Sequence, residues 1–211
     1  MSIPPHGSAP LVRAGPPPSA AHGRLIMVHG RGATADGIAS MAVPLRALDR
    51  WSVVAPQATG NTWYPFSFLA PMEQNEPGIT SGIALIESLV SAALAEGFPS
   101  DRIALMGFSQ GACLTLEFVA RHPRRYAAVL GYSGGLIGPP GTPRNYAGAL
   151  DGTPVFLGCS DVDSHVPAER VRETADVLTR MGATVDMRLY PGMGHLVNDE
   201  EIEVGRGLLG A

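Results

Sequence analysis

Short apolar runs alternate with helix-patterned segments along most of this 211-residue chain, and this alternation constrains its fold more than any other feature. Near-continuous apolar runs such as residues 25–28 are typical of strands buried on both faces. One helical segment repeats apolar residues with the period of a helix face, at Ile79, Ile83, Ile86, Val90 and Ala93. Strands that alternate with helices indicate βαβ units. The sequence therefore predicts an α/β fold with a mostly parallel sheet of about six to seven strands, covered by helices on both faces.

The predicted elements divide the chain into an arm and one domain. Strands are predicted at Arg24–Val28, Ser52–Ala55, Ile103–Phe108, Ala127–Gly131, Val155–Leu157 and Val185–Tyr190. Helices are predicted at Ile38–Leu48, Ile79–Glu96, Gly111–His122 and Ala168–Met181, with a last helix that begins near Asp199 and is capped by Asn198 or Asp199. Residues 1–23 are rich in Pro, Gly and Ala, so we expect a loose N-terminal arm with one short strand near Leu11–Ala14. A single domain is expected over residues 24–211.

The composition excludes several classes of protein. Apolar residues make up 45% of the chain and charged residues 16%, which favours a well-packed globular protein. The net charge of -4, without a basic stripe, argues against nucleic acid as a partner. No apolar run approaches the ~20 residues that span a bilayer, and the first 22 residues lack the apolar core of an export signal, so we expect no membrane insertion. Cys113 and Cys159 are too few for a disulfide framework and are interpreted as small buried side chains, which favours a cytoplasmic protein.

The pattern Gly-x-Ser-x-Gly occurs twice, at residues 107–111 and 131–135. In this pattern the serine lies on a sharp turn between a strand and a helix, and the glycines prevent clashes there. The first copy precedes a good helix sequence, whose N-terminal N–H groups favour a developing oxyanion. The second copy leads to Pro139 and Pro140, which exclude a helix. We therefore predict Ser109 as the nucleophile and interpret Ser133 as part of an ordinary turn at a strand end.

His195 is the predicted general base. It follows the last predicted strand, in a loop from which an imidazole reaches a serine at the carboxyl edge of the sheet. The order serine, acid, histidine along the chain is that of serine hydrolases built on such sheets. His6 and His22 lie in the predicted arm and are expected to be solvated, whereas His122 ends a helix, which favours a structural role.

The acid that orients His195 should follow the strand Val155–Leu157, and two carboxylates, Asp161 and Asp163, are available there. These two residues with His165 would also suit a metal site. Because the chain has no other obvious ligand cluster, we expect no metal.

Backbone N–H groups are the predicted donors to a reacting carbonyl. One comes from Gln110, the residue after the nucleophile, and the glycines of the loop at residues 29–33 let a second N–H turn toward the same point. No Lys follows at the spacing of a phosphate-binding loop, so a nucleotide site is not expected. The segment 57–78 has no clear period, and loops of this length are usually functional. Its large apolar residues either line a substrate pocket or anchor the loop on the body: Trp63, Tyr64, Phe66, Phe68 and Leu69.

Residues 24–209 resemble the phospholipase/carboxylesterase family, which includes acyl-protein thioesterases and small bacterial carboxylesterases. The resemblance rests on four motifs, at residues 29–32, 107–111, 163–167 and 192–195. It implies an α/β-hydrolase fold without a large cap domain, no cofactor and activity on carboxylic esters. It also implies that the N–H of Arg31 contributes to the oxyanion hole. The acid in this family stands three residues before a Val-Pro pair, which selects Asp163. Members often carry an acidic residue where this chain has Pro65, so a different pocket is expected.

Together these observations predict a carboxylesterase that cleaves esters with small or medium acyl chains through an acyl-enzyme intermediate. We expect a small-molecule ester as its substrate and a monomer or homodimer as its assembly. A thioesterase or a lysophospholipase with the same triad is the alternative. A non-catalytic small-molecule-binding module is a further alternative, although such modules usually lack a triad residue and this chain offers all three.

Overall fold

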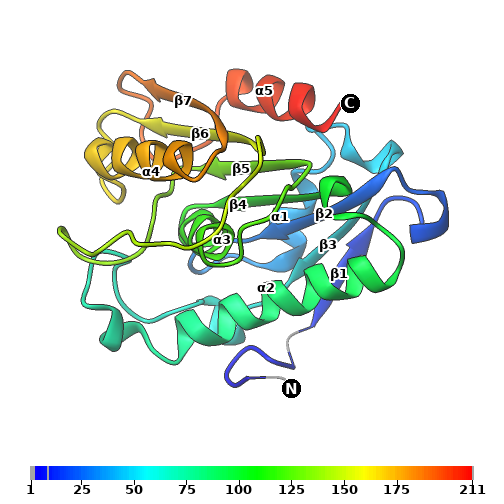
Figure 1. Cartoon of the computed structure of the whole chain (residues 1–211), viewed down its shortest axis with the longest axis horizontal. Helices are drawn as coiled ribbons and strands as arrows, with labels where there is room; N and C mark the ends of the chain where they lie inside the picture. Colours follow the sequence, from blue (N-terminus) through cyan, green and yellow to red (C-terminus); the bar gives the residue numbers. More distant parts are fainter. Residues whose placement is uncertain (1–2, 9, 211) are drawn as a thin grey trace.

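Over residues 3–8 and 10–210, which the computed structural model describes, seven strands form one sheet in the order β1-β3-β2-β4-β5-β6-β7 (Figure 1). The strands are β1 Leu11–Ala14, β2 Gly23–Val28, β3 Trp51–Pro56, β4 Ile103–Phe108, β5 Ala128–Tyr132, β6 Pro154–Ser160 and β7 Thr184–Tyr190. Strand β1 pairs antiparallel with β3, and all other neighbours are parallel. The predicted mostly parallel sheet is therefore confirmed, and the carboxyl ends of six strands meet at one edge.

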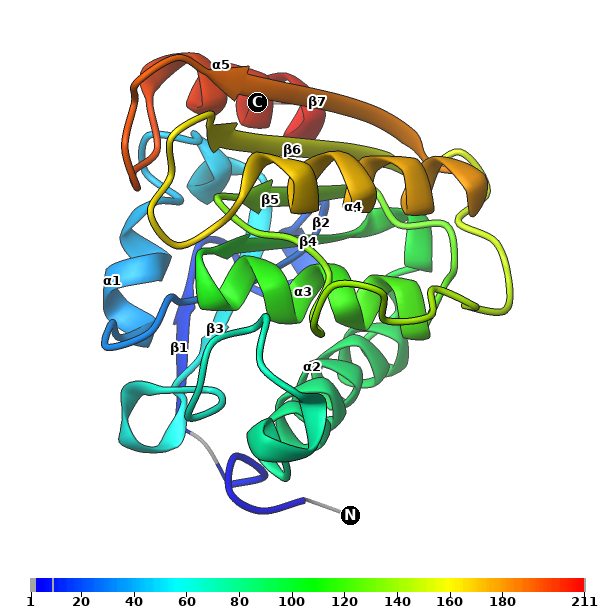
Figure 2. The same ribbon diagram turned by 90° about the vertical axis from the view of Figure 1, so that its left-hand side faces the viewer.

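Helices cover both faces of the sheet (Figure 2). The helices are α1 Ala35–Ser40, α2 Gly78–Ala95, α3 Gln110–Arg121, α4 Ala168–Arg180 and α5 Asp199–Leu209. Short 3-10 turns lie at Pro18–Ala20, Ala47–Asp49, Thr59–Asn61, Met72–Asn75 and Ser100–Arg102. Helices α2, α3 and α4 pack on one face, and α1 and α5 pack on the other. Because side chains alternate along a strand, Ile26 faces the first group of helices and Leu25 the second.

The first predicted helix is wrong in extent. The structure has a helix at Ala35–Ser40, capped by Thr34, whose hydroxyl oxygen accepts the N–H of Gly37 at 3.1 Å. Turns follow in place of the predicted continuation to Leu48. Pro44 lacks the N–H that a continuing helix needs, and Arg46 has a left-handed backbone with φ +52°. Helices α2, α3 and α4 begin and end within one residue of the prediction, and α5 begins at the predicted Asp199 with Asn198 as its cap.

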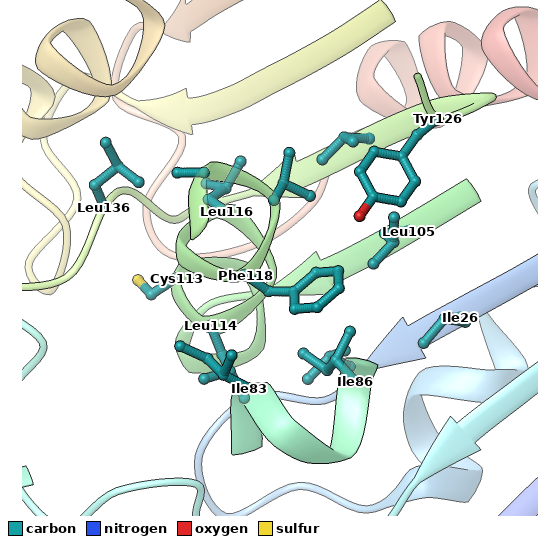
Figure 3. Close-up of a cluster of buried hydrophobic side chains, with 14 of the residues drawn as sticks. Ile26, Ile83, Ile86, Leu105, Cys113, Leu114, Leu116, Phe118, Tyr126 and Leu136 are labelled. Carbon is teal, nitrogen blue, oxygen red and sulfur yellow. The ribbon is translucent and has the colours of Figure 1, made fainter. Parts of the chain in front are cut away.

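Helix α2 is a core helix. Gly82 lets it approach α3 closely, because a Cβ there would lie 2.7 Å from a methyl carbon of Leu114. Leu114 of α3 lies against Ile83 of α2 (Figure 3). By length and composition alone α2 is apolar enough to cross a membrane, which corrects the expectation that no apolar run approaches that length. More than half of the helix is buried inside the protein, as expected of a helix that packs on a sheet.

The described part of residues 1–23 is fastened to the body, which corrects the prediction of a loose arm. Strand β1 extends the sheet at the position predicted for it. Upstream, His6 is 1% exposed, although it was expected to be solvated. It contacts the loop at residues 57–77, hereafter the pocket loop, which runs from β3 to α2. The composition of residues 1–23 predicts an irregular backbone, but it does not reveal the contacts that hold the described part of this stretch to the rest of the protein.

Candidate active site

Ser109 lies on the turn between β4 and α3. Its backbone is strained, with a positive φ of +55° and ψ of -122°. A Cβ at Gly107 would lie 2.4 Å from the carbonyl oxygen of Gly111, and a Cβ at Gly111 would lie 2.1 Å from the carbonyl oxygen of Val28. Both approaches are too close for any side chain, so the motif needs both glycines. The strained turn lifts the Ser109 hydroxyl to the carboxyl edge of the sheet.

Three side chains from three loops form one hydrogen-bonded chain at this edge. The Ser109 hydroxyl lies 2.8 Å from Nε2 of His195, and Nδ1 of His195 lies 2.7 Å from Oδ2 of Asp163. Ser109 follows β4, Asp163 follows β6 and His195 follows β7. A carboxylate only accepts, so Nδ1 carries the proton and Nε2 of the neutral ring accepts from the serine. This is the geometry of an activated nucleophile.

Asp163 is held by the loop that carries it. Its side chain is fully buried, and Oδ1 accepts the N–H groups of His165 at 2.8 Å and Val166 at 3.0 Å. Burial by itself raises the pKa of the carboxyl, but the hydrogen bonds from His195 and from these two N–H groups outweigh it and hold the pKa below its ordinary value. Asp163 therefore stays ionised beside the imidazole.

Asp161, the other carboxylate of this loop, does not reach the imidazole. Its Oδ1 accepts the N–H of Gly192 at 2.8 Å, and the side chain is exposed. It braces the loop that carries His195. Asp163 is already hydrogen-bonded to His195 and to two backbone N–H groups. Asp161, Asp163 and His165 are therefore not arranged as the metal site that their spacing also allowed.

Ser133, the serine of the second motif, shares the positive φ of Ser109 but not its surroundings. It follows β5 with φ +49°, and its N–H donates to the carbonyl of Gly158 at 2.7 Å. The residue is 0% exposed, so no substrate reaches its hydroxyl. No helix follows it before β6.

The two backbone N–H groups predicted for the oxyanion hole flank Ser109. Arg31 and Gln110 both line the cavity in front of the serine. In the part of the chain that the structure describes, neither N–H has a hydrogen-bond acceptor. Both donors are therefore available to a ligand.

The side chains of these two residues have a second role, which the sequence did not reveal. The Gln110 amide donates to the carbonyl of Tyr64 at 2.8 Å and accepts the N–H of Trp63 at 2.9 Å. The Arg31 guanidinium donates to the carbonyls of Pro65 at 2.8 Å and Phe66 at 2.6 Å. The two residues whose N–H groups are predicted for the oxyanion hole thus also hold the pocket loop through their side chains. Nothing in their spacing indicates this, because the contacts depend on a loop without regular structure.

A cavity of about 610 Å³ opens beside Ser109. Tyr64 and Phe66 line it, as one interpretation of the sequence predicted, but Trp63 does not. Trp63 is fully buried, and its indole N–H donates to the carbonyl of His29 at 2.8 Å, so this residue anchors the loop. Phe68, another predicted candidate for the pocket wall, also lines the cavity, as does His165. The lining further includes residues that sequence reasoning did not place there: Gly30, Ala33, Pro65, Ser67, Phe108, Cys113 and Val166.

Comparisons with known proteins agree with this architecture. A sequence profile described as phospholipase/carboxylesterase matches residues 13–205. Acyl-protein thioesterase 1 of Neurospora crassa is 29% identical over 205 residues, which cover 85% of this chain and 82% of that protein. Acyl-protein thioesterase 1 of Schizosaccharomyces pombe is 31% identical over 164 residues, with 72% and 73% covered.

Among solved structures, a phospholipase/carboxylesterase from Dyadobacter fermentans DSM 18053 is 40% identical, with a TM-score of 0.94 and 100% of both chains covered. The match covers the whole chain, and the described residues form the sheet and its helices without a large cap domain. The profile, the sequence relatives and the solved structure all support one assignment, which the motifs had indicated. The chain belongs to the phospholipase/carboxylesterase family and has the α/β-hydrolase fold.

Proposed function

We propose that the protein is a carboxylesterase in which Ser109 is the nucleophile, His195 the general base and Asp163 the residue that orients it. The observation that carries this proposal is the continuous hydrogen-bonded chain from Ser109 through His195 to Asp163 at the rim of a cavity. A buried carboxylate, a neutral imidazole and a serine on a strained turn are the parts that acyl transfer requires.

Acylation begins when the Ser109 oxygen attacks the ester carbonyl carbon and its proton passes to Nε2 of His195. The carbonyl oxygen gains the negative charge and accepts the N–H groups of Arg31 and Gln110. Asp163 stabilises the imidazolium that has formed. The bond to the alcohol oxygen then breaks, Nε2 returns its proton to that oxygen, and the alcohol leaves an acyl-serine behind.

Deacylation repeats these steps with water. His195 takes a proton from the water as its oxygen attacks the acyl carbon, and the same N–H groups hold the second oxyanion. Collapse of this intermediate breaks the bond to the serine oxygen, which recovers its proton from Nε2. The acid product leaves and the resting chain is restored. No step uses a cofactor or a metal, so activity should survive a strong chelator.

The cavity supports small, uncharged substrates. Its volume of about 610 Å³ lies within the usual range for small-molecule sites, roughly 300–1,000 Å³. Three phenylalanines, a tyrosine and a valine line it, and no Asp or Glu side chain does so among the described residues. The one Arg in the lining, Arg31, already donates to the carbonyls of Pro65 and Phe66. Esters of small or medium acyl chains fit this lining. We further propose that the enzyme works in the cytoplasm as a monomer or homodimer.

A thioesterase is the second candidate, and the relatives named acyl-protein thioesterase 1 are the observation that favours it. Matched oxygen and thio esters of butyrate separate the two candidates. A carboxylesterase should show the larger kcat/KM on the oxygen ester, whereas preference for the thioester would replace this proposal with the second. Ser109→Ala should abolish turnover of both. A folded wild-type protein that hydrolyses neither ester nor thioester would contradict both candidates.

A further inference from the structure

The N-terminal segment, residues 3–8, is pinned to the pocket loop and to α2. The hydroxyl oxygen of Ser81 accepts the N–H of His6 at 2.8 Å, and the Ser81 hydroxyl donates to the carbonyl of Ile3 at 2.6 Å. On the loop side, the Thr59 hydroxyl donates to the carbonyl of Pro5 at 2.7 Å. A segment without regular structure is thus fixed between two elements that lie more than fifty residues further along the chain.

The imidazole of His6 bridges the two ends of a short stretch of the pocket loop. Its Nδ1 lies 3.2 Å from the N–H of Thr59, and its Nε2 lies 2.9 Å from the carbonyl oxygen of Trp63. The Thr59 N–H is a donor and the Trp63 carbonyl an acceptor, so Nδ1 must be unprotonated and Nε2 must carry the proton. Only the neutral ring, in this one tautomer, satisfies both contacts. The residue is 1% exposed, so water does not replace either of them.

A second buried imidazole, that of His29, also lies beside Trp63. Nε2 of His29 accepts the N–H of Ala58 at 3.0 Å, and Nδ1 lies 2.7 Å from the carbonyl oxygen of Gly30. The ring centroids of His6 and His29 each lie 5.1 Å from that of Trp63. Two neutral imidazoles therefore accept successive backbone N–H groups, at residues 58 and 59, and both rings lie close to the indole that anchors the loop.

This anchored stretch leads directly into the wall of the cavity. Tyr64 and Phe66 follow Trp63 and line the cavity, and the carbonyls of Pro65 and Phe66 hold the Arg31 guanidinium. A displacement of residues 59–63 would therefore move both the cavity wall and the residue that offers one oxyanion N–H.

We propose that His6 is a positioning residue of the active site, which fixes the pocket loop through its neutral imidazole and thereby sets the shape of the acyl pocket. The inference rests on the proposed esterase function and adds a residue that lies outside the catalytic chain.

Protonation of His6 should release the loop. A charged ring carries a proton on both nitrogens, so Nδ1–H would oppose the N–H of Thr59. Burial lowers the pKa of His6, and the hydrogen bond to the Trp63 carbonyl opposes this effect only in part. The titratable group that faces His6 is His29, whose pKa burial also lowers. The bridge is therefore intact at neutral pH and opens in acid.

The test compares His6→Ala, which removes both contacts, with His6→Asn, which keeps an acceptor near the position of Nδ1. His22→Ala is the matched control, because His22 lies in the same part of the chain but packs on Trp51, with ring centroids 5.6 Å apart.

For a nitrophenyl butyrate substrate, His6→Ala should raise KM about tenfold with a smaller change in kcat, as expected for one or two lost hydrogen bonds. His6→Asn should recover part of this loss, and His22→Ala should match the wild type. The acid limb of the kcat/KM profile should be shallower in His6→Asn than in the wild type.

A measurement on the wild type covers the case in which His6→Ala does not fold. Imidazole ¹⁵N chemical shifts should show His6 as the Nε2–H tautomer at neutral pH, and the amide of Thr59 should lose hydrogen-exchange protection as His6 becomes protonated. An Nδ1–H tautomer, or a folded His6→Ala with unchanged KM and acyl-chain preference, would overturn the inference. Neither the chemical shifts nor the hydrogen exchange of the wild type requires a substrate. A failure of the proposed esterase function can therefore be distinguished from a failure of the inference about His6.

Discussion

Asp163→Asn tests the orientation of His195 by changing one atom. The Asn carbonyl oxygen can keep the N–H groups of His165 and Val166, which lie 2.8 and 3.0 Å from Oδ1 in the wild type. Its amide nitrogen then takes the position of Oδ2, 2.7 Å from Nδ1 of His195. An amide N–H is a donor, so Nδ1 must become the acceptor and Nε2 must take the proton. In that tautomer Nε2 cannot accept the proton of Ser109.

We expect kcat to fall by about 10⁴-fold, the loss caused by the same change in serine proteases, which corresponds to about 5.5 kcal/mol in the activation free energy. Asp161→Asn is the matched control. Its side-chain oxygen can still accept the N–H of Gly192, and the residue is exposed, so a loss of less than ~10-fold is expected. Steady-state hydrolysis of nitrophenyl butyrate measures both, with thermal unfolding to show that each variant is folded. The reverse order of the two losses, or an Asp163→Asn variant with more than a tenth of wild-type kcat, would refute the reasoning.

Three further predictions concern the loop, the turn and α5. Phe66→Ala should change relative activity across acyl chain lengths with little loss of stability, because Phe66 is an exposed wall of the cavity. The buried Trp63 differs, and Trp63→Ala should cost about 3–5 kcal/mol in the free energy of unfolding. Equal chain-length profiles for Phe66→Ala and the wild type would contradict the predicted role of Phe66. Gly111→Ala should prevent stable folding, seen as loss of the thermal transition, because its Cβ would lie 2.1 Å from the Val28 carbonyl oxygen; a stable, active variant would count against the turn geometry. Burial raises the pKa of Glu201 from the ordinary 4.5 to about 7, so the folded protein binds this proton more tightly than the unfolded chain does. The free energy of unfolding should therefore fall as the pH rises across that interval. Glu201→Gln should remove up to about 3 kcal/mol of this pH dependence, measured by denaturant titrations at pH 5 and 8, and an unchanged pH dependence in the variant would exclude the shift.

The sheet and most helices could be predicted because their signals are local. Strands of a parallel sheet are buried on both faces, so a continuous apolar run such as residues 25–28 identifies one without tertiary information. The exception is the segment 38–48, whose apolar residues fit a helix although Pro44 and the left-handed Arg46 break it. The placement of Ser109 beside His195 could be predicted because a sharp turn and a loop after the last strand have their own sequence patterns.

Contacts made by irregular segments could not be predicted in this way. An aromatic residue in a long loop suits a pocket wall and a buried anchor equally well, and only the contact with the His29 carbonyl assigns Trp63 to the second role. The spacing of Asp161 and Asp163 left either as the acid, and their different roles arise from which one the loop turns toward His195. Likewise, a Pro- and Gly-rich composition does not show that residues 3–8 pack against a loop some fifty residues away. Cytoplasmic location and the monomeric or dimeric state stay predictions.

The most direct test of the central claim is the site of covalent labelling by a fluorophosphonate, which reacts with an activated serine hydroxyl. Mass spectrometry of the digested protein should place one adduct per chain on Ser109, the half-buried serine whose hydroxyl is hydrogen-bonded to His195. Ser133→Ala should be labelled like the wild type, and Ser109→Ala should not be labelled. An adduct on Ser133, or undiminished labelling of folded Ser109→Ala, would contradict the assignment of Ser109 as the nucleophile.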